Sequence, residues 1–148
     1  MKAHYDNIET NMIQHYSEIK FNVFGDERGS LISVESFNNL PFDIKRLYYI
    51  YNTVSGIKRG CHAHQTLKQC LIVVAGSCSV RVDDGNVQET FHLRSPNKGL
   101  IIEGLIWREL FDFSDDAVVI VLANDYYENT TYIRDYTTFL DRLKNSNA

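Results

Sequence analysis

Short segments of alternating or β-branched residues, each closed by a turn signal, constrain the fold of this chain most. The clearest are Ile44–Tyr51, rich in aromatic and β-branched residues, and the segments 78–82 and 87–93, which flank an Asp-Gly turn at Asp84 and Gly85. The run Cys70–Ala75 is apolar throughout, as in a strand buried on both faces. About nine to eleven short strands at such spacing predict a β-sandwich or β-barrel.

Three further segments complete the expected secondary structure. Ile19–Phe24 and Leu31–Phe37 alternate between apolar and polar residues and predict strands, whereas residues 1–18 predict a loose lead-in or a short strand. Only Tyr132–Lys144 changes period, with apolar residues at helical intervals, and predicts a C-terminal helix. Because the 148 residues contain no linker or internal repeat, we expect one domain over residues 1–148.

Charge and hydropathy exclude several classes of protein. A net charge of −4 argues against a general nucleic-acid binder, which usually shows a basic face. The sequence has no apolar run long enough to cross a membrane and no signal-peptide core, so we expect a cytoplasmic protein without a membrane partner. The three cysteines form no Cys-x-x-Cys motif and predict buried free thiols, and Cys61 should point to the face opposite that of His62.

A pair of histidines gives the first indication of function. His62 and His64 stand two residues apart, so on a strand both point to the same face, and in a barrel that face would look into a sheltered cavity. The spacing His-x-His, four residues, Gln69, six residues, Gly76 resembles the first motif of the cupins, with glutamine in place of glutamate. Two imidazoles and a neutral amide fall short of the three protein ligands usual in catalytic metal sites, so we expect no metal. The pair could also be two satisfied, partly buried polar residues.

A closer resemblance covers the chain from about Glu27 to Phe139. It is carried by Arg59-Gly60-x-His62-Ala63-His64, by Asp125-Tyr126-Tyr127 with Tyr132-Ile133-Arg134, and by the shorter matches Arg28-Gly29-Ser30-Leu31, Arg46-x-Tyr48-Tyr49-Ile50 and Trp107-x-Glu109. Together these motifs resemble the nucleotide-sugar 3,4-ketoisomerases of the cupin superfamily. One departure is Arg108, where the resemblance implies His more often.

The resemblance implies an all-β cupin jelly-roll barrel with a short C-terminal helix. It also implies an isomerase that moves the ketone of dTDP-4-keto-6-deoxy-D-glucose from C4 to C3, without a cofactor, in the synthesis of a deoxyamino sugar for a polysaccharide or another glycosylated product. It further implies a homodimer, with N-terminal strands exchanged between subunits.

The chemistry requires a base whose pKa lies near neutrality, and histidine, with an unperturbed pKa of about 6.5, suits this role. We expect His62 to be the main acid/base and His64 its partner, which donates to the enediolate oxygen or relays the proton. The resemblance favours His62 for the first role; the residues alone do not order the two.

The substrate would carry a diphosphate, and a guanidinium can bind phosphate oxygens through two hydrogen bonds. Arg46 and Arg59 are therefore candidate ligands, and Arg28 is a third that could reach a neighbouring subunit. Tyr48 shares a strand face with Arg46, so its hydroxyl should face the sugar. Trp107 could wall the pocket or belong to the core.

Three other functions stay open at this point. They are a metal-dependent cupin oxygenase or isomerase, a noncatalytic cupin that binds a nucleotide sugar, and an epimerase of dTDP-keto-sugars. The configuration at C4 of a 3-keto product, gluco or galacto, also stays open.

Overall fold

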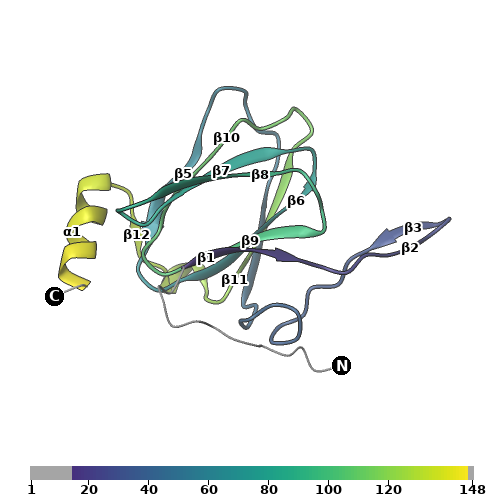
Figure 1. Ribbon diagram of the computed structural model, residues 1–148, viewed down its shortest axis with the longest axis horizontal. Helices are drawn as coiled ribbons and strands as arrows, with labels where there is room; N and C mark the ends of the chain where they lie inside the picture. Colours follow the sequence, from purple (N-terminus) through teal and green to yellow (C-terminus); the bar gives the residue numbers. More distant parts are fainter. Residues whose placement is uncertain (1–14, 147–148) are drawn as a thin grey trace.

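The computed structural model describes residues 15–146, so the expectation for the first 14 residues lies outside the described part. The chain folds mainly into strands with one C-terminal helix, as predicted (Figure 1). The elements are β1 (Tyr16–Lys20), β2 (Phe24–Asp26), β3 (Gly29–Leu31), β4 (Arg46–Ile50), β5 (Arg59–His64), β6 (Lys68–Ala75), β7 (Cys78–Asp83), β8 (Gln88–Leu93), β9 (Lys98–Glu103), β10 (Trp107–Phe111), β11 (Val118–Ala123), a 3-10 turn at Tyr127–Asn129, β12 (Tyr132–Ile133) and α1 (Tyr136–Ser146).

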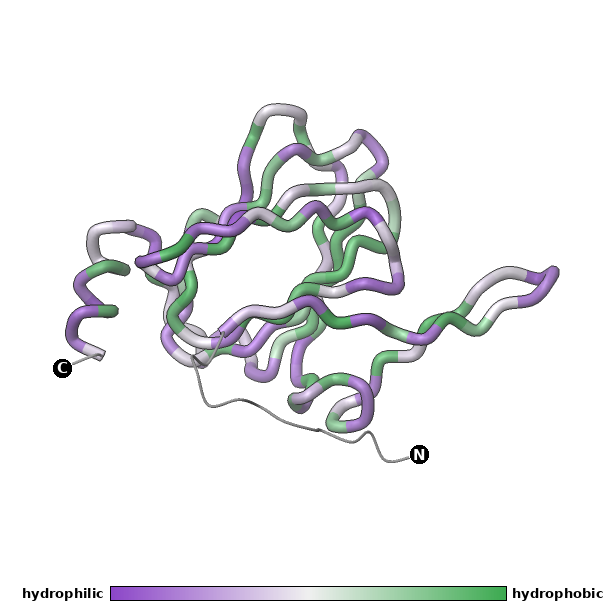
Figure 2. Tube along the Cα trace, viewed as in Figure 1, coloured by the Kyte–Doolittle hydropathy of each residue, from purple (hydrophilic) through white to green (hydrophobic). Residues whose placement is uncertain are grey.

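Two five-stranded antiparallel sheets face each other. One has the order β1-β9-β6-β11-β4 and the other β12-β5-β10-β7-β8, so the chain passes repeatedly from sheet to sheet, as in a jelly roll. Hydrophobic stretches run along strands of both sheets (Figure 2). Leu71 and Val73 of the first sheet and Val80 and Leu110 of the second belong to one buried cluster between the sheets. The predicted jelly-roll barrel is therefore confirmed.

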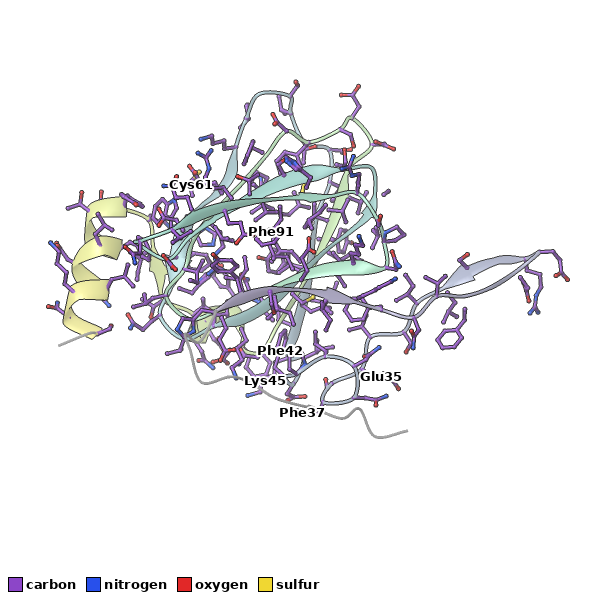
Figure 3. All side chains as sticks on the ribbon, in the orientation of Figure 1. Glu35, Phe37, Phe42, Lys45, Cys61 and Phe91 are labelled. Atoms are coloured by element: carbon purple, nitrogen blue, oxygen red, sulfur yellow. The ribbon has the colours of Figure 1, made fainter. Side chains whose placement is uncertain are left out.

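Strand β6 is buried on both of its faces, which is why apolar and polar residues do not alternate along it. Leu71 and Val73 face the space between the sheets, while Cys70 and Ile72 belong to a second cluster on the other side. That outer cluster is closed by the segment before β4, whose Phe42 is buried there (Figure 3). Burial on both faces removes any need for polar residues along most of the strand.

Two predicted strands are wrong in their extent. Ile19–Phe24 is divided, because β1 ends at Lys20 and β2 begins at Phe24. Leu31–Phe37 is not a strand beyond Leu31; apart from a single bridge at Ser36, it has no strand neighbour in the described chain. Its Ile32 and Val34 pack on the outer cluster instead. Alternation predicts a strand only where a partner strand is available, which local sequence does not reveal. Strands β2 and β3 instead form a hairpin that projects from the barrel (Figure 1).

The helix begins at Tyr136, four residues after the predicted start at Tyr132. Tyr132 and Ile133 form β12, which pairs with β5. The carboxylate of Asp135 accepts hydrogen bonds from the backbone N and the Oγ1 of Thr138, both at 2.9 Å. Asp135 therefore caps the N-terminus of the helix, which begins at the next residue. Within residues 15–146, no helix has the length and apolar character needed to cross a membrane.

Candidate functional site

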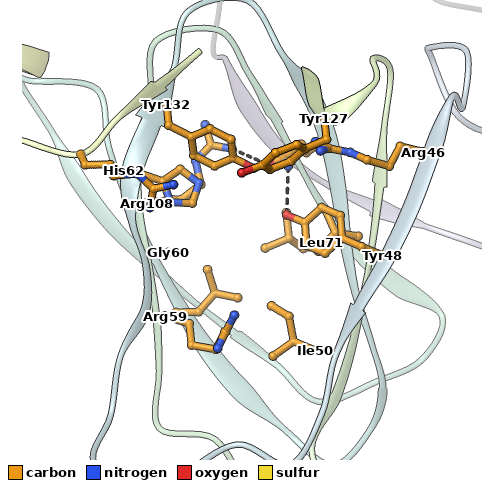
Figure 4. A pocket seen from close by; sticks show the side chains of 14 residues that line it. Arg46, Tyr48, Ile50, Arg59, Gly60, His62, Leu71, Arg108, Tyr127 and Tyr132 are labelled. Atoms are coloured by element: carbon orange, nitrogen blue, oxygen red, sulfur yellow. Dashed lines mark hydrogen bonds between the residues drawn. The ribbon is translucent and has the colours of Figure 1, made fainter. Parts of the chain in front are cut away.

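A cavity of about 450 Å3 opens into the barrel. Its walls come from strands of both sheets and from the segment around β12 (Figure 4). The lining residues are the basic residues Arg46, Arg59, Arg108, Arg134 and His62, the polar or small residues Tyr48, Tyr127, Tyr132, Gln69 and Gly60, and the aliphatic residues Ile50, Leu71, Leu110 and Val121.

A β-bulge places His62 in this cavity. Arg108 of β10 pairs with His62 and Glu109 pairs with Gly60, so Cys61 is an extra residue in β5. Gly60 and Cys61 both adopt positive φ, 79° and 54°, a conformation that glycine accepts without strain. The Cys61 thiol lies 3.9 Å from Glu109 Oε1, outside the cavity, as predicted. The bulge thus sets His62 directly across from Arg108.

His62 and His64 lie edge to face, with ring centroids 4.6 Å apart. Tyr132 packs against both rings, at 5.1 Å and 4.6 Å. His62 lines the main cavity, whereas His64 is fully buried behind it and lines a separate polar pocket of about 100 Å3 with Asn124 and Thr131. Neither ring nitrogen of His64 forms a hydrogen bond to the described residues.

Both imidazoles are held neutral. Burial, followed by the positive charge of Arg108, lowers the pKa of His62 to about 4. Burial, followed by Arg108 and then His62, lowers the pKa of His64 to about 2. At neutral pH each ring therefore has a free lone pair, and His62 can accept a proton from a ligand in the cavity.

Arg108 is a buried cation inside the barrel, with 2% of its surface exposed. Its Nη1 donates to Gln69 Oε1 at 2.5 Å and its Nη2 donates to the backbone oxygen of Ile106 at 3.0 Å. Gln69 Nε2 in turn donates to the hydroxyl of Tyr48 at 3.1 Å. Burial lowers the pKa of Arg108 to about 10, so it keeps its charge at neutral pH.

The cavity favours an anionic ligand. Four arginines line it, and no acidic residue is among the described residues that do. Arg46 stacks over Tyr48 at 5.4 Å and Tyr127 at 5.7 Å, and its Nε and Nη2 form no hydrogen bond within residues 15–146. Arg134 stacks over Tyr132 at 4.7 Å. Unpartnered buried guanidinium donors are costly, and phosphate oxygens would satisfy them.

The residues at the cupin metal position do not fit a metal ion. The structure shows no group of three His, Cys, Asp or Glu side chains suited to a metal within the part of the chain that it describes. Gln69 stands where the cupin motif has glutamate, and its oxygen already accepts a hydrogen bond from Arg108. A cation there would also face the positive charge of Arg108.

The structure brings four sequence-predicted site residues, Arg46, Tyr48, Arg59 and His62, to one cavity; His62 and Arg108 lie across it from Arg46 and Tyr48 (Figure 4). His64 lies directly behind His62. Arg46 and Tyr48 share a strand face, as expected. Arg59 and His62 are three positions apart and reach the same cavity because of the bulge at Cys61, whereas His64, expected to look into the same cavity as His62, lines the smaller pocket instead.

Two predicted residues lie elsewhere. Trp107 packs against Tyr136 and Phe139 of α1, with 8% of its surface exposed, so it belongs to the core and does not wall the cavity. Being adjacent to Arg108 in β10, it must point to the opposite face of the sheet. Arg28 is in the tight turn of the projecting hairpin, where it pairs with Asp26 and is not near the cavity of its own chain.

Sequence reasoning missed several residues of the site. Arg108 was noted only as a departure, and Gln69 only as a missing metal ligand. Tyr127, Tyr132 and Arg134 also line the cavity, although no role at the site was assigned to them from the sequence. The available signal was the match of this segment to the resembled family.

Comparisons with known proteins agree with this geometry. The family model FdtA, described as WxcM-like, C-terminal, matches residues 14–144. A curated relative from Aneurinibacillus thermoaerophilus, a TDP-4-oxo-6-deoxy-alpha-D-glucose-3,4-oxoisomerase, is 48% identical over 121 residues, which are 82% of this chain and 87% of the relative.

Two solved structures extend the comparison. The sugar 3,4-ketoisomerase QdtA from Thermoanaerobacterium thermosaccharolyticum, in complex with TDP, is 40% identical with a TM-score of 0.87, covering 91% of this chain and 98% of its own. The TDP-quinovose 3,4-ketoisomerase WlaRB from Campylobacter jejuni is 42% identical with a TM-score of 0.83, covering 87% of this chain and 99% of its own. The resemblance drawn from the sequence motifs is confirmed, and the chain belongs to the FdtA (WxcM-like, C-terminal) family.

Proposed function

We propose that this chain is a sugar-nucleotide 3,4-ketoisomerase that converts TDP-4-keto-6-deoxyglucose into a TDP-3-keto-6-deoxyhexose. The observation that carries the proposal is a neutral imidazole, His62, that faces the buried cation Arg108 within an arginine-lined cavity. The curated relative and the two structural neighbours are named for the same class of reaction.

The reaction needs a base and an electrostatic partner for one oxygen. The C4 carbonyl acidifies the C–H bond at C3, and His62 removes that proton, so the electron pair of this bond forms the C3–C4 double bond of an enediolate. The enediolate oxygen gains negative charge, which the guanidinium of Arg108 stabilises without reorganisation because it is already fixed. The proton of the C3 hydroxyl then passes to the oxygen on C4, which leaves the negative charge on the C3 oxygen. Protonation of C4 by the His62 imidazolium re-forms a carbonyl at C3, so the ketone has moved to C3 and His62 is neutral again.

The diphosphate makes His62 a stronger base in the complex. Arg46, Arg59 and Arg134 are the cavity arginines available to bind it, since Arg108 is held by Gln69. In the free protein burial, and after it the positive charge of Arg108, lower the pKa of His62. A bound anion offsets part of the positive field of Arg108, and this acts to raise the pKa of His62 from its low value in the free protein.

His64 supports His62 in this scheme. It is fully buried, contacts His62 edge to face and borders the small polar pocket behind the cavity. Because His64 does not line the cavity, we assign it the role of partner to His62: it packs against that ring and against Tyr132 while His62 exchanges protons with the substrate. The ordering of the two histidines rests on their positions, since only His62 lines the substrate cavity.

We propose that the protein acts as a homodimer. The hairpin β2–β3 projects from the barrel, and its Phe24 and Leu31 are 63% and 60% exposed (Figure 1). Among residues 15–146, strand β4 pairs on one side only, so it is an edge of its sheet, and it exposes Leu47 and Tyr49. A second copy would cover both features, because the hairpin can add strands to an unpaired edge. Arg28, in the hairpin turn, would then enter the partner's site.

Cell location and pathway follow from the same proposal. The thiols of Cys61, Cys70 and Cys78 are all free, as is usual in the reducing cytoplasm. We therefore place the reaction there, on a route to a deoxyamino sugar for a surface polysaccharide or another glycosylated product.

One experiment tests the function and its base. The protein is incubated with TDP-4-keto-6-deoxyglucose in heavy water, and the position of the ketone and of deuterium is followed by NMR. We expect a 3-keto product, with His62→Asn slowed about 10²–10⁴-fold. Near-native turnover of that variant would remove His62 as the base. Inversion at a carbon with the ketone still at C4 would indicate an epimerase, and TDP binding without conversion would indicate a binding protein.

A further inference from the structure

Gln69 of β6 bridges two groups of the site that come from other strands. It is 1% exposed, and its amide lies between Arg108 of β10 and Tyr48 of β4. Oε1 accepts from Arg108 Nη1 at 2.5 Å, and Nε2 donates to the hydroxyl oxygen of Tyr48 at 3.1 Å. Both partners line the cavity.

The direction of these bonds is forced. A guanidinium only donates hydrogen bonds, so the amide must turn its oxygen to Arg108 and its NH₂ group to Tyr48. The hydroxyl oxygen of Tyr48 is then an acceptor of the amide, and its own proton is free to point into the cavity. Burial raises the pKa of Tyr48, so this proton is retained at neutral pH.

A carboxylate of the same shape would reverse this arrangement. Glutamate at position 69 would accept from Arg108, and it would also demand a donor on the other side. Tyr48 would then turn its proton to the carboxylate and offer only lone pairs to the cavity. The charge of Arg108 would be paired as well, and less of its field would act on a ligand.

We propose that Gln69 is a positioning residue that sets the polarity of the cavity: its neutral amide leaves the charge of Arg108 unpaired and turns the hydroxyl proton of Tyr48 towards an oxygen of the bound keto-sugar. This inference rests on the proposed ketoisomerase function. The bound keto-sugar would then receive hydrogen bonds from two donors, the guanidinium of Arg108 and the neutral hydroxyl of Tyr48. Gln69 holds both of these groups in place.

The test uses two substitutions that separate polarity from packing. Gln69→Glu keeps the shape of the side chain and its contact with Arg108, so a purely structural role predicts unchanged melting temperature and turnover. Our inference predicts a kcat about 10- to 100-fold lower, with little change in KM because the diphosphate-binding arginines are untouched. Asn86→Asp is the matched control, since it makes the same amide-to-carboxylate change at an exposed residue in the turn between β7 and β8, away from the cavity; it should keep wild-type kinetics.

A double-mutant cycle identifies the route of the effect. If Gln69 acts through Tyr48, Gln69→Leu lowers kcat by a smaller factor in a Tyr48→Phe background than in the wild type. Equal factors in both backgrounds, or wild-type kcat in Gln69→Glu, would overturn the inference. If Gln69→Leu does not fold, Gln69→Glu alone decides. Absence of ketone migration in the wild type would overturn the proposed function and this inference with it, whereas an active wild type with an unaffected Gln69→Glu would remove the inference alone.

Discussion

Acidification should destabilise this protein through the two buried imidazoles. In the unfolded chain a histidine titrates near 6.5, whereas the folded pKa is about 4 for His62 and about 2 for His64. Between these values the unfolded state binds more protons than the folded state. The free energy of unfolding therefore falls as the pH drops through 6.5, and it continues to fall to about pH 4 for His62 and about pH 2 for His64.

The size of this loss in the free energy of unfolding follows from the pH range over which only the unfolded chain binds protons. Between pH 7 and pH 5 an unfolded imidazole changes from mostly neutral to almost fully protonated, while both folded rings stay neutral. Each ring then contributes a loss of about 2 kcal/mol over this interval, so the pair contributes about 4 kcal/mol. For a chain of this size that loss lowers the melting temperature by roughly 10 °C.

The assay is urea denaturation at pH 7, 6 and 5, followed by the fluorescence of Trp107, which is the single tryptophan and is buried. Wild type is compared with His64→Gln and with the double variant His62→Gln/His64→Gln. The double variant should lose about 4 kcal/mol less than wild type between pH 7 and 5, and the single variant about half of that. Identical pH dependence in the three proteins would refute the conclusion that burial holds the pair neutral.

Three further substitutions test other parts of the structure. Arg108→Met removes a buried charge, so we expect an unchanged or higher melting temperature but a turnover about 10²–10³-fold lower; unaltered turnover would contradict the role given to the guanidinium. Gly60→Ala places a side chain at φ 79° and brings its Cβ within 3.2 Å of the Arg108 carbonyl, so stability should fall by about 1–3 kcal/mol in urea denaturation. Asp135→Ala removes the cap that accepts from Thr138 and should cost about 1 kcal/mol in the same assay, with turnover retained.

Much of the fold was predictable because it depends on local patterns. Alternation, β-branched residues and the Asp84-Gly85 turn predicted most of the strands and the barrel, since a strand half-buried in a sheet needs a period of two. The same period placed Tyr48 in the cavity beside Arg46. The segment 31–37 has this pattern and is not a strand, because strand pairing depends on a partner elsewhere in the chain.

The sequence by itself determined the all-β class, the paired histidines and, through its motifs, the family of the chain. Only the tertiary structure decided how the site works. Gln69 and Arg108 are 39 positions apart, and Tyr48 lies on a third strand, so no local period could show that they meet. The low pKa of His62 arises from burial first and then from Arg108, its neighbour across the bulge. Burial, cross-strand neighbours and the field of a distant charge are properties of the packed barrel, since they depend on contacts between residues that are remote in the chain.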